Sequence, residues 1–82
     1  MEITLKLFSY FAKLLPPEAK HYAIEVETEP GIRVAEVLES FGVPLDECRL
    51  IIINGIVHTR PDQALQFELK PGDALAVLPN VH

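Results

Sequence analysis

The sequence has few of the residues that several classes of protein require. It contains a single cysteine, Cys48, and no tryptophan. A lone cysteine forms no internal disulfide and completes no Cys-x-x-Cys metal or redox pair, which fits a reducing cytoplasm. No apolar run approaches the roughly 18 residues that a membrane span requires. We therefore expect neither a disulfide scaffold nor a membrane protein.

Basic residues are also scarce, with 7 Lys and Arg against 12 Asp and Glu and a net charge of −5. Nucleic-acid binding needs Lys and Arg gathered on one face, and the sequence has no basic cluster, so we expect no nucleic-acid partner. An acidic chain suits a partner that has a basic patch. Residues 1–8 include Glu2 and Lys6 and lack a small-residue cleavage site, so we expect no signal peptide.

The length allows one domain. A domain usually takes roughly 100–200 residues, and a chain of 82 residues without repeats, linkers or charge blocks offers no internal boundary. We expect residues 1–82 to form one domain around one core. Because so short a chain buries only about 60% of the surface that its unfolded form exposes, a deep cleft between two lobes is not expected.

Hydrophobic periodicity predicts the secondary structure. Alternation typical of half-buried strands, or a short apolar run, identifies five strands: 2–8, 21–28, 50–53, 56–58 and 74–78. In the second strand the alternation places Tyr22 inward with Ile24 and Val26. A helical spacing identifies one main helix, whose apolar stripe is Val34, Val37, Leu38 and Phe41. A short helix over 9–14 precedes the second strand.

Turn and cap residues mark where these elements end. Ser9 can cap the short helix, and Gly42 stands where the C-terminal cap of the main helix is expected. Asn54-Gly55 tolerates positive φ at both positions and predicts a tight hairpin. Residues 70–73, Lys-Pro-Gly-Asp, predict a turn in which the Asp73 side chain bonds to the local backbone.

This order of elements predicts an α+β roll: one mixed sheet wraps the main helix, with the first and last strands in its middle. Asn54-Gly55 between strands, Pro71-Gly72-Asp73 before the last strand, and the ending Leu78-Pro79-Asn80-Val81 resemble the MoaD and ThiS family of sulfur carriers, over nearly the whole chain. MoaD is the small subunit of molybdopterin synthase. The resemblance implies the ubiquitin-like β-grasp fold, a mixed sheet of four to five strands that wraps one main helix, plus a short helix.

The resemblance also implies a chemistry located at the chain end. In the family, an adenylating enzyme activates the carboxylate of a Gly-Gly tail with ATP, and the resulting thiocarboxylate donates sulfur. The candidate tail here is Pro79, Asn80, Val81 and His82, with no glycine pair among the 82 residues. Three explanations stay open: the glycines were lost from this piece, they are exposed or added in another way, or a natural homologue kept the fold and the partner surface and dropped the carrier chemistry. We expect the third.

A partner surface is expected on the sheet face away from the main helix. Phe8, Ala76 and Leu78, with one parity of 50–53, would form an apolar patch there, and such patches often mark interfaces. In the family, this face and the tail dock on an adenylating enzyme or on the larger subunit of molybdopterin synthase. Homodimerisation, or cover by the segment 59–69, remains as an alternative. A strand that is apolar on both sides, such as 50–53, needs cover on both sides.

The remaining reactive side chains form no recognisable site. We interpret Cys48 as a small filler at a loop-to-strand junction, because Asp46 and Glu47 oppose a thiolate and no His or second Cys stands near it in sequence. His21, His58 and His82 lack the spacing of metal ligands, and we expect no cofactor. Three hypotheses follow: a MoaD-like carrier, a non-carrier ubiquitin-like binding module that uses the same docking groove, or a structural domain or homo-oligomer.

Overall fold

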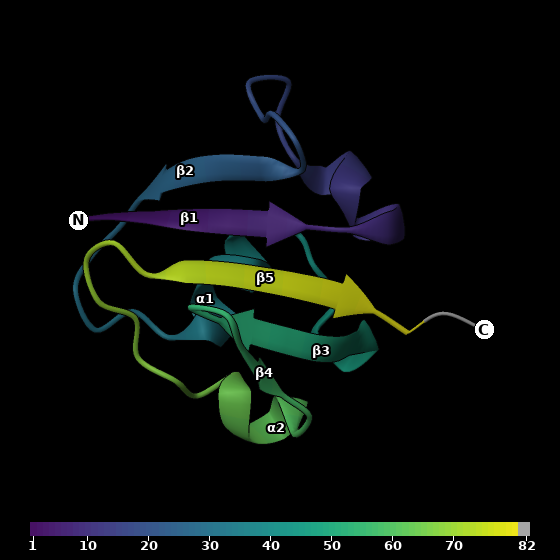
Figure 1. Ribbon diagram of the computed structural model, residues 1–82, viewed down its shortest axis with the longest axis vertical. Coiled ribbons are helices and arrows are strands. Elements are labelled where there is room, and N and C mark those ends of the chain that lie inside the picture. The colour runs from purple at the N-terminus through teal and green to yellow at the C-terminus, as the bar shows by residue number, and fades with distance from the viewer. Residues whose placement is uncertain (81–82) are drawn as a thin grey trace.

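The computed structural model describes residues 1–80 of the chain. Its elements, with η for a 3-10 helix, are β1 (Glu2–Leu7), η1 (Ser9–Leu14), β2 (Ala23–Glu27), α1 (Val34–Ser40), η2 (Leu45–Glu47), β3 (Cys48–Ile53), β4 (Ile56–His58), α2 (Pro61–Ala64) and β5 (Ala74–Pro79). The strands form one sheet in the order β2-β1-β5-β3-β4 (Figure 1). β1 and β5 run parallel, and the other pairs are antiparallel. The predicted α+β roll is confirmed.

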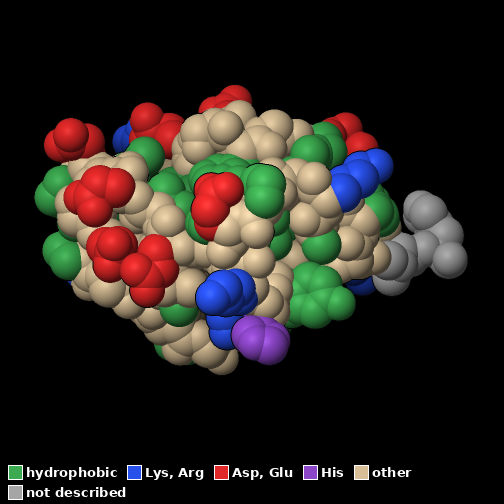
Figure 2. All heavy atoms as spheres, turned by 90° about the horizontal axis from the view of Figure 1, so that it is seen from above, with side chains coloured by type: hydrophobic (Ala, Val, Ile, Leu, Met, Phe, Trp, Pro, Cys, Tyr) green, Lys and Arg blue, Asp and Glu red, His purple; other side chains and the backbone are tan. Residues whose placement is uncertain are grey.

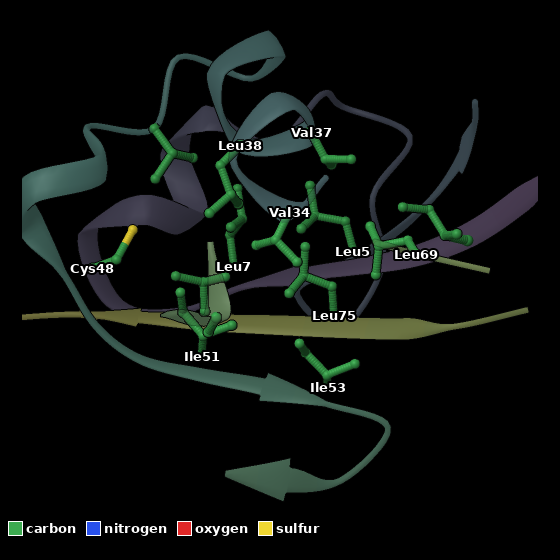
Figure 3. Close-up of a cluster of buried hydrophobic side chains, with 14 of the residues drawn as sticks. Leu5, Leu7, Val34, Val37, Leu38, Cys48, Ile51, Ile53, Leu69 and Leu75 are labelled. Carbon is green, nitrogen blue, oxygen red and sulfur yellow. The ribbon is translucent and has the colours of Figure 1, made fainter. Parts of the chain in front are cut away.

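The core lies between the sheet and α1. Alternate residues of three strands point to this side and are buried: Ile3, Leu5, Leu7, Ile51, Ile53, Leu75 and Val77. Helix α1 opposes them with Val34, Val37 and Leu38, as the apolar stripe predicts (Figure 3). Because full burial of one such side chain contributes about 1.5–3 kcal/mol, this layer is the main source of stability.

Both ends of α1 have partners for their backbone groups. At the start, the Glu36 carboxylate accepts a hydrogen bond from the backbone N–H of Arg33 (3.0 Å). At the end, Gly42 has a φ of +77°. The backbone N–H of Val43 then reaches back to the Leu38 carbonyl (3.0 Å), which is the hydrogen bond of a Schellman cap. The predicted cap at Gly42 is confirmed.

Two of the motifs that suggested the family resemblance contact each other. Asn54 and Gly55 have φ values of +51° and +82° and join β3 to β4 in a tight hairpin, as predicted. Asp73 accepts the Lys70 backbone N–H (2.8 Å), which confirms its turn bond. Its other carboxylate oxygen accepts from the Asn54 side-chain amide (2.9 Å), and Asn54 Oδ1 accepts from the Ala74 backbone N–H (2.8 Å). These bonds tie the hairpin to the start of β5.

Two local expectations near the N-terminus are wrong. Ser9 is no cap: it is the first residue of η1 with a φ of +55°, and Phe8 occupies the cap position without a side-chain hydrogen bond. Tyr22 does not point inward, because it is 56% exposed and has a φ of +66°. The alternation that suggested an inward Tyr22 extends beyond the strand itself, which begins only at Ala23.

Within residues 1–80 only one face of the sheet is covered. The segment 59–69 packs on the helix side, where Ala64 and Leu69 are buried in the core and Leu65 packs against it. Leu50 and Ile52 stay half-buried on the opposite face. The segment 59–69 therefore does not cover the patch, and within residues 1–80 the outward side of the strand 50–53 keeps only partial burial.

Leu75→Ala is expected to lower the free energy of unfolding by about 2–5 kcal/mol, because the side chain is fully buried and its loss leaves a cavity. Leu78→Ala is the matched control, since it lies in the same strand on the open face and should cost about 1 kcal/mol or less. Urea unfolding of both variants measures the difference. Equal losses at the two positions would contradict a one-sided core.

Candidate functional site

The sheet face opposite α1 is apolar over β5, β3 and β4, whereas β1 contributes the exposed Lys6, which pairs with Ala76. This face is turned toward the viewer in Figure 1, with α1 behind the sheet. Strand register pairs Leu50 with Leu78 and Ile52 with Ala76. Phe8 extends β1 by one residue, and its N–H donates to the Val77 carbonyl (3.3 Å). We define the outer apolar patch as Phe8, Leu50, Ile52, Val57, Ala76 and Leu78, of which none packs against the core cluster.

The structure places the residues of the predicted patch on the expected face, and their role in binding stays a prediction. The structure brings Phe8, Ala76 and Leu78 to one face, together with the predicted parity of the strand 50–53. The expected residues did not include Val57, which pairs with Ile52 and is 53% exposed. A signal for Val57 was present, because a two-residue turn fixes the pairing of the strands on either side of it.

An acidic margin borders the patch on the β2 side. Glu2, Glu25 and Glu27 alternate outward on β1 and β2, and all three are exposed. The N-terminal ammonium of Met1 lies 2.9 Å from Glu27 and offsets part of its charge. A hydrogen bond with Glu25, and then the negative charge of that group, raise the pKa of Glu2. Figure 2, which looks onto the β2 edge, shows acidic side chains gathered at the end where β1 begins and β2 finishes.

The candidate tail begins later than the sequence suggests. Pro79 is the last residue of β5, is buried, and pairs with Cys48 on β3, so the strand is one residue longer than expected. Asn80 is exposed. Val81 and His82, the other two candidate tail residues, lie outside the described residues.

Three residues hold the point at which the chain leaves the sheet, through two side chains and backbone groups. The Asn80 backbone N–H donates to the Glu47 carbonyl (2.9 Å). The Tyr10 hydroxyl donates to Glu47 Oε1 (2.8 Å) and lies 3.2 Å from the Asn80 carbonyl oxygen, which shares its proton. The hydrogen bond to Glu47 raises the pKa of Tyr10. We call Tyr10, Glu47 and Asn80 the exit clamp, because together they fix the direction of the chain after β5.

Cys48 is held as a neutral thiol. Its side chain is 5% exposed, and its Sγ lies 3.7 Å from the Pro44 carbonyl oxygen. Desolvation, followed by the negative charges of Asp46 and Glu47, raises the pKa of this thiol to about 11. Since only the thiolate is a strong nucleophile, the structure agrees with the interpretation of Cys48 as a filler.

Residues 1–80 contain no group of three His, Cys, Asp or Glu side chains that could hold a metal ion. His21 lies in the loop before β2, and His58 lies on β4 with its ring centroid 6.3 Å from that of Phe67. Within the same range, no helix has both the length and the apolar character that a membrane crossing demands.

A mixed five-stranded sheet that wraps one main helix, with parallel first and last strands, defines the class of ubiquitin-like β-grasp domains. Comparison of the chain with known protein families and solved structures agrees with this class. The chain belongs to the Mut7-C ubiquitin family, whose model matches residues 1–82. Together with the solved structures below, this match confirms the ubiquitin-like β-grasp fold that the resemblance implied.

Solved structures of two proteins have similar folds. A Pyrococcus furiosus protein described as molybdopterin converting factor, subunit 1, is 24% identical, with 98% of each chain covered and a TM-score of 0.63. Small archaeal modifier protein 1 of Haloferax volcanii is 21% identical, with 98% of each chain covered and a TM-score of 0.67. The TM-scores establish the shared fold, and at identities of 21–24% the likeness shows the fold alone. A search of curated proteins gave no match.

The pKa of Cys48 predicts a loss of stability in alkali. The unfolded chain releases the thiol proton near the ordinary pKa of 9.0, whereas the folded chain keeps it to about 11. The stabilisation is therefore complete below pH 9 and is lost as the pH rises to 11, by about 2–3 kcal/mol. Urea unfolding from pH 8 to 11 measures it. Cys48→Ala is the control, and parallel pH profiles for the two chains would contradict the assignment.

Tyr10→Phe is expected to loosen the exit clamp. A hydrogen bond contributes about 0.5–1.5 kcal/mol, so its loss should speed hydrogen exchange at the Asn80 amide by roughly 2–10-fold. Exchange measured by NMR checks this. Tyr22→Phe removes a hydroxyl elsewhere and should leave Asn80 unchanged. Equal rates at Asn80 in Tyr10→Phe and the unchanged chain would show that the hydroxyl does not hold the exit.

Proposed function

We propose that this domain is a non-catalytic docking protein of the sulfur-carrier and modifier type, which binds an adenylating enzyme. The observation that supports this most is the outer apolar patch, which lies open beside the point where the chain leaves the sheet. An enzyme that acts on the end of such a chain needs a surface of the domain to bind. It also needs the chain to leave the sheet in a fixed direction. The patch supplies the first, and the exit clamp supplies the second.

Charge favours a particular kind of partner surface. On the β2 side of the patch, Glu2, Glu25 and Glu27 outnumber Lys6, which pairs with Ala76 on this face, and the chain has a net charge of −5. A partner with an apolar centre and Lys or Arg on one rim complements this arrangement, and such complementarity speeds association. A protein like the large subunit of molybdopterin synthase would meet the same requirement. The name of the P. furiosus neighbour favours this pterin pathway.

The carrier chemistry is the finer part of the proposal. The adenylating enzyme would join the terminal carboxylate to the AMP part of ATP with release of pyrophosphate. A donor of sulfide-level sulfur would then displace AMP and leave a thiocarboxylate. A non-carrier binding module would occupy the same groove without modification. Incubating the protein, as the cell makes it, with ATP, enzyme and sulfur donor separates the two. Sulfur in place of one oxygen, seen by mass spectrometry, identifies a carrier, and unchanged mass with intact binding identifies a module.

Cys48 and the buried core bear on where the domain works and how it folds. We place the domain in the cytoplasm, where a free thiol such as Cys48 stays reduced. We also take residues 1–82 as one folding unit, since the buried residues form one cluster.

Leu78→Glu is expected to weaken binding to a candidate adenylating enzyme by about 10–100-fold, because it puts a charge at the centre of an apolar interface. Ala76→Glu should act in the same direction. Ile56→Glu is the matched control: it is 64% exposed and pairs with Ile53, whose side chain points to the other face. Isothermal titration calorimetry gives the affinities, and melting curves show that each variant folds. Unchanged affinity for both Leu78→Glu and Ala76→Glu would reject the patch as the docking surface.

A further inference from the structure

Backbone strain is concentrated at one corner of the open face. Residues 1–80 contain four non-glycine residues with positive φ: Ser9, His21, Tyr22 and Asn54. Asn is among the residues that tolerate this conformation, whereas a bulky residue such as Tyr is an outlier there. Two of the four adjoin Phe8, because Ser9 follows it in sequence and the Tyr22 ring packs against it, and His21 precedes Tyr22.

His21 and Tyr22 are the two central residues of a tight turn. The Lys20 N–H donates to the Ala23 carbonyl, and the Ala23 N–H donates to the Lys20 carbonyl, both at 2.9 Å. The φ values of +53° and +66° match the turn type of Asn54-Gly55, which has +51° and +82°. Asn-Gly is the preferred pair for such a turn. The chain therefore contains a relaxed and a strained version of the same turn.

The strained turn directs Tyr22 against Phe8. The two ring centroids are 5.5 Å apart, with 39° between the ring planes. The Leu7 N–H donates to the Tyr22 carbonyl (3.1 Å), which fixes the turn to the end of β1. Tyr22 is nevertheless 56% exposed, so a large part of its ring remains available for a contact. The pair extends the outer apolar patch toward the β2 edge.

We propose that Tyr22 is an anchor residue of the docking face and inserts into an apolar socket of the protein partner, with Phe8 as its support. The inference rests on the proposed function and names a residue on which the affinity depends. Tyrosine is enriched among the few residues that dominate binding free energies, since it buries a large area at a low entropic cost. The contact with Phe8 orders the ring before binding, which lowers the cost of ordering it in the complex.

A hollow on this chain, beside the turn, indicates which partner side chain lies next to the apolar socket of the partner. Its volume is about 430 Å³, and its lining residues are Thr4, Glu18, Lys20, Ala23, Ile24 and Glu25. Two carboxylates against one ammonium group, with Ala23 and Ile24 as apolar walls, suit the aliphatic stem and charged head of a Lys or Arg. The partner surface is therefore an apolar socket with a basic side chain next to it, which agrees with the acidic margin of the patch.

The test compares Tyr22→Ala, Tyr22→Phe and the double variant His21→Asn with Tyr22→Gly. Each is titrated into the same adenylating enzyme as Leu78→Glu. Tyr22→Ala and the double variant should bind about tenfold more weakly or worse, and Tyr22→Phe should stay within about threefold because it keeps the ring. The double variant should melt at the same temperature or higher, since Asn-Gly fits the turn. Weaker binding without a loss of stability is a result that a purely structural role would not give.

Each other outcome overturns a defined part of the argument. If Tyr22→Ala binds within about twofold of the unchanged chain while Leu78→Glu loses binding, Tyr22 is no anchor and the proposed function stands. If neither change weakens binding, or if the unchanged chain does not bind the enzyme, both are rejected. If the double variant loses affinity and melting temperature together, the turn has only a structural role.

Discussion

One short helix covers one face of the sheet, and the rest of the structure depends on this one-sided burial. In β5, Leu75 and Val77 are buried while Ala76 and Leu78 remain half-buried, because successive side chains of a strand point to opposite faces. Helix α1 has only seven residues, and the four-residue α2 is used on the same side. The opposite face thus keeps its apolar residues available to another protein.

The start of η1 connects the outer apolar patch to the exit clamp. Phe8, immediately before η1, belongs to the outer apolar patch, and Tyr10, two residues later, reaches Glu47 and Asn80. Ser9 lies between them with a φ of +55°. The change of backbone direction at Ser9 thus separates two aromatic side chains, one in the outer apolar patch and one in the exit clamp. A partner that contacts Phe8 would therefore bind only two residues away from Tyr10, which holds the exit.

Local rules were sufficient for most of the fold and for part of the site. The stripe of α1, the Gly42 cap and the turn at Asn54-Gly55 depend on residues close in sequence, so the sequence alone identified them. The exit clamp could not be found in this way, because Tyr10 bonds to residues 37 and 70 positions away. The prediction that Tyr22 points inward was wrong for a different reason. The alternation of apolar residues continues through 21–22, and a His-Tyr pair does not indicate a turn.

The choice of residues at 21–22 is not explained by the fold. Asn-Gly would make the same two backbone hydrogen bonds between Lys20 and Ala23 without strain. A residue held in a sparsely populated conformation costs about 1–3 kcal/mol, and an aromatic pair contributes about 0.5–1.5 kcal/mol, so the contact with Phe8 does no more than offset the strain at Tyr22. Native domains are stable by only about 5–15 kcal/mol, and such a cost is a sizeable part of that total. The proposed contact of Tyr22 with a partner would account for a turn that the chain itself does not need.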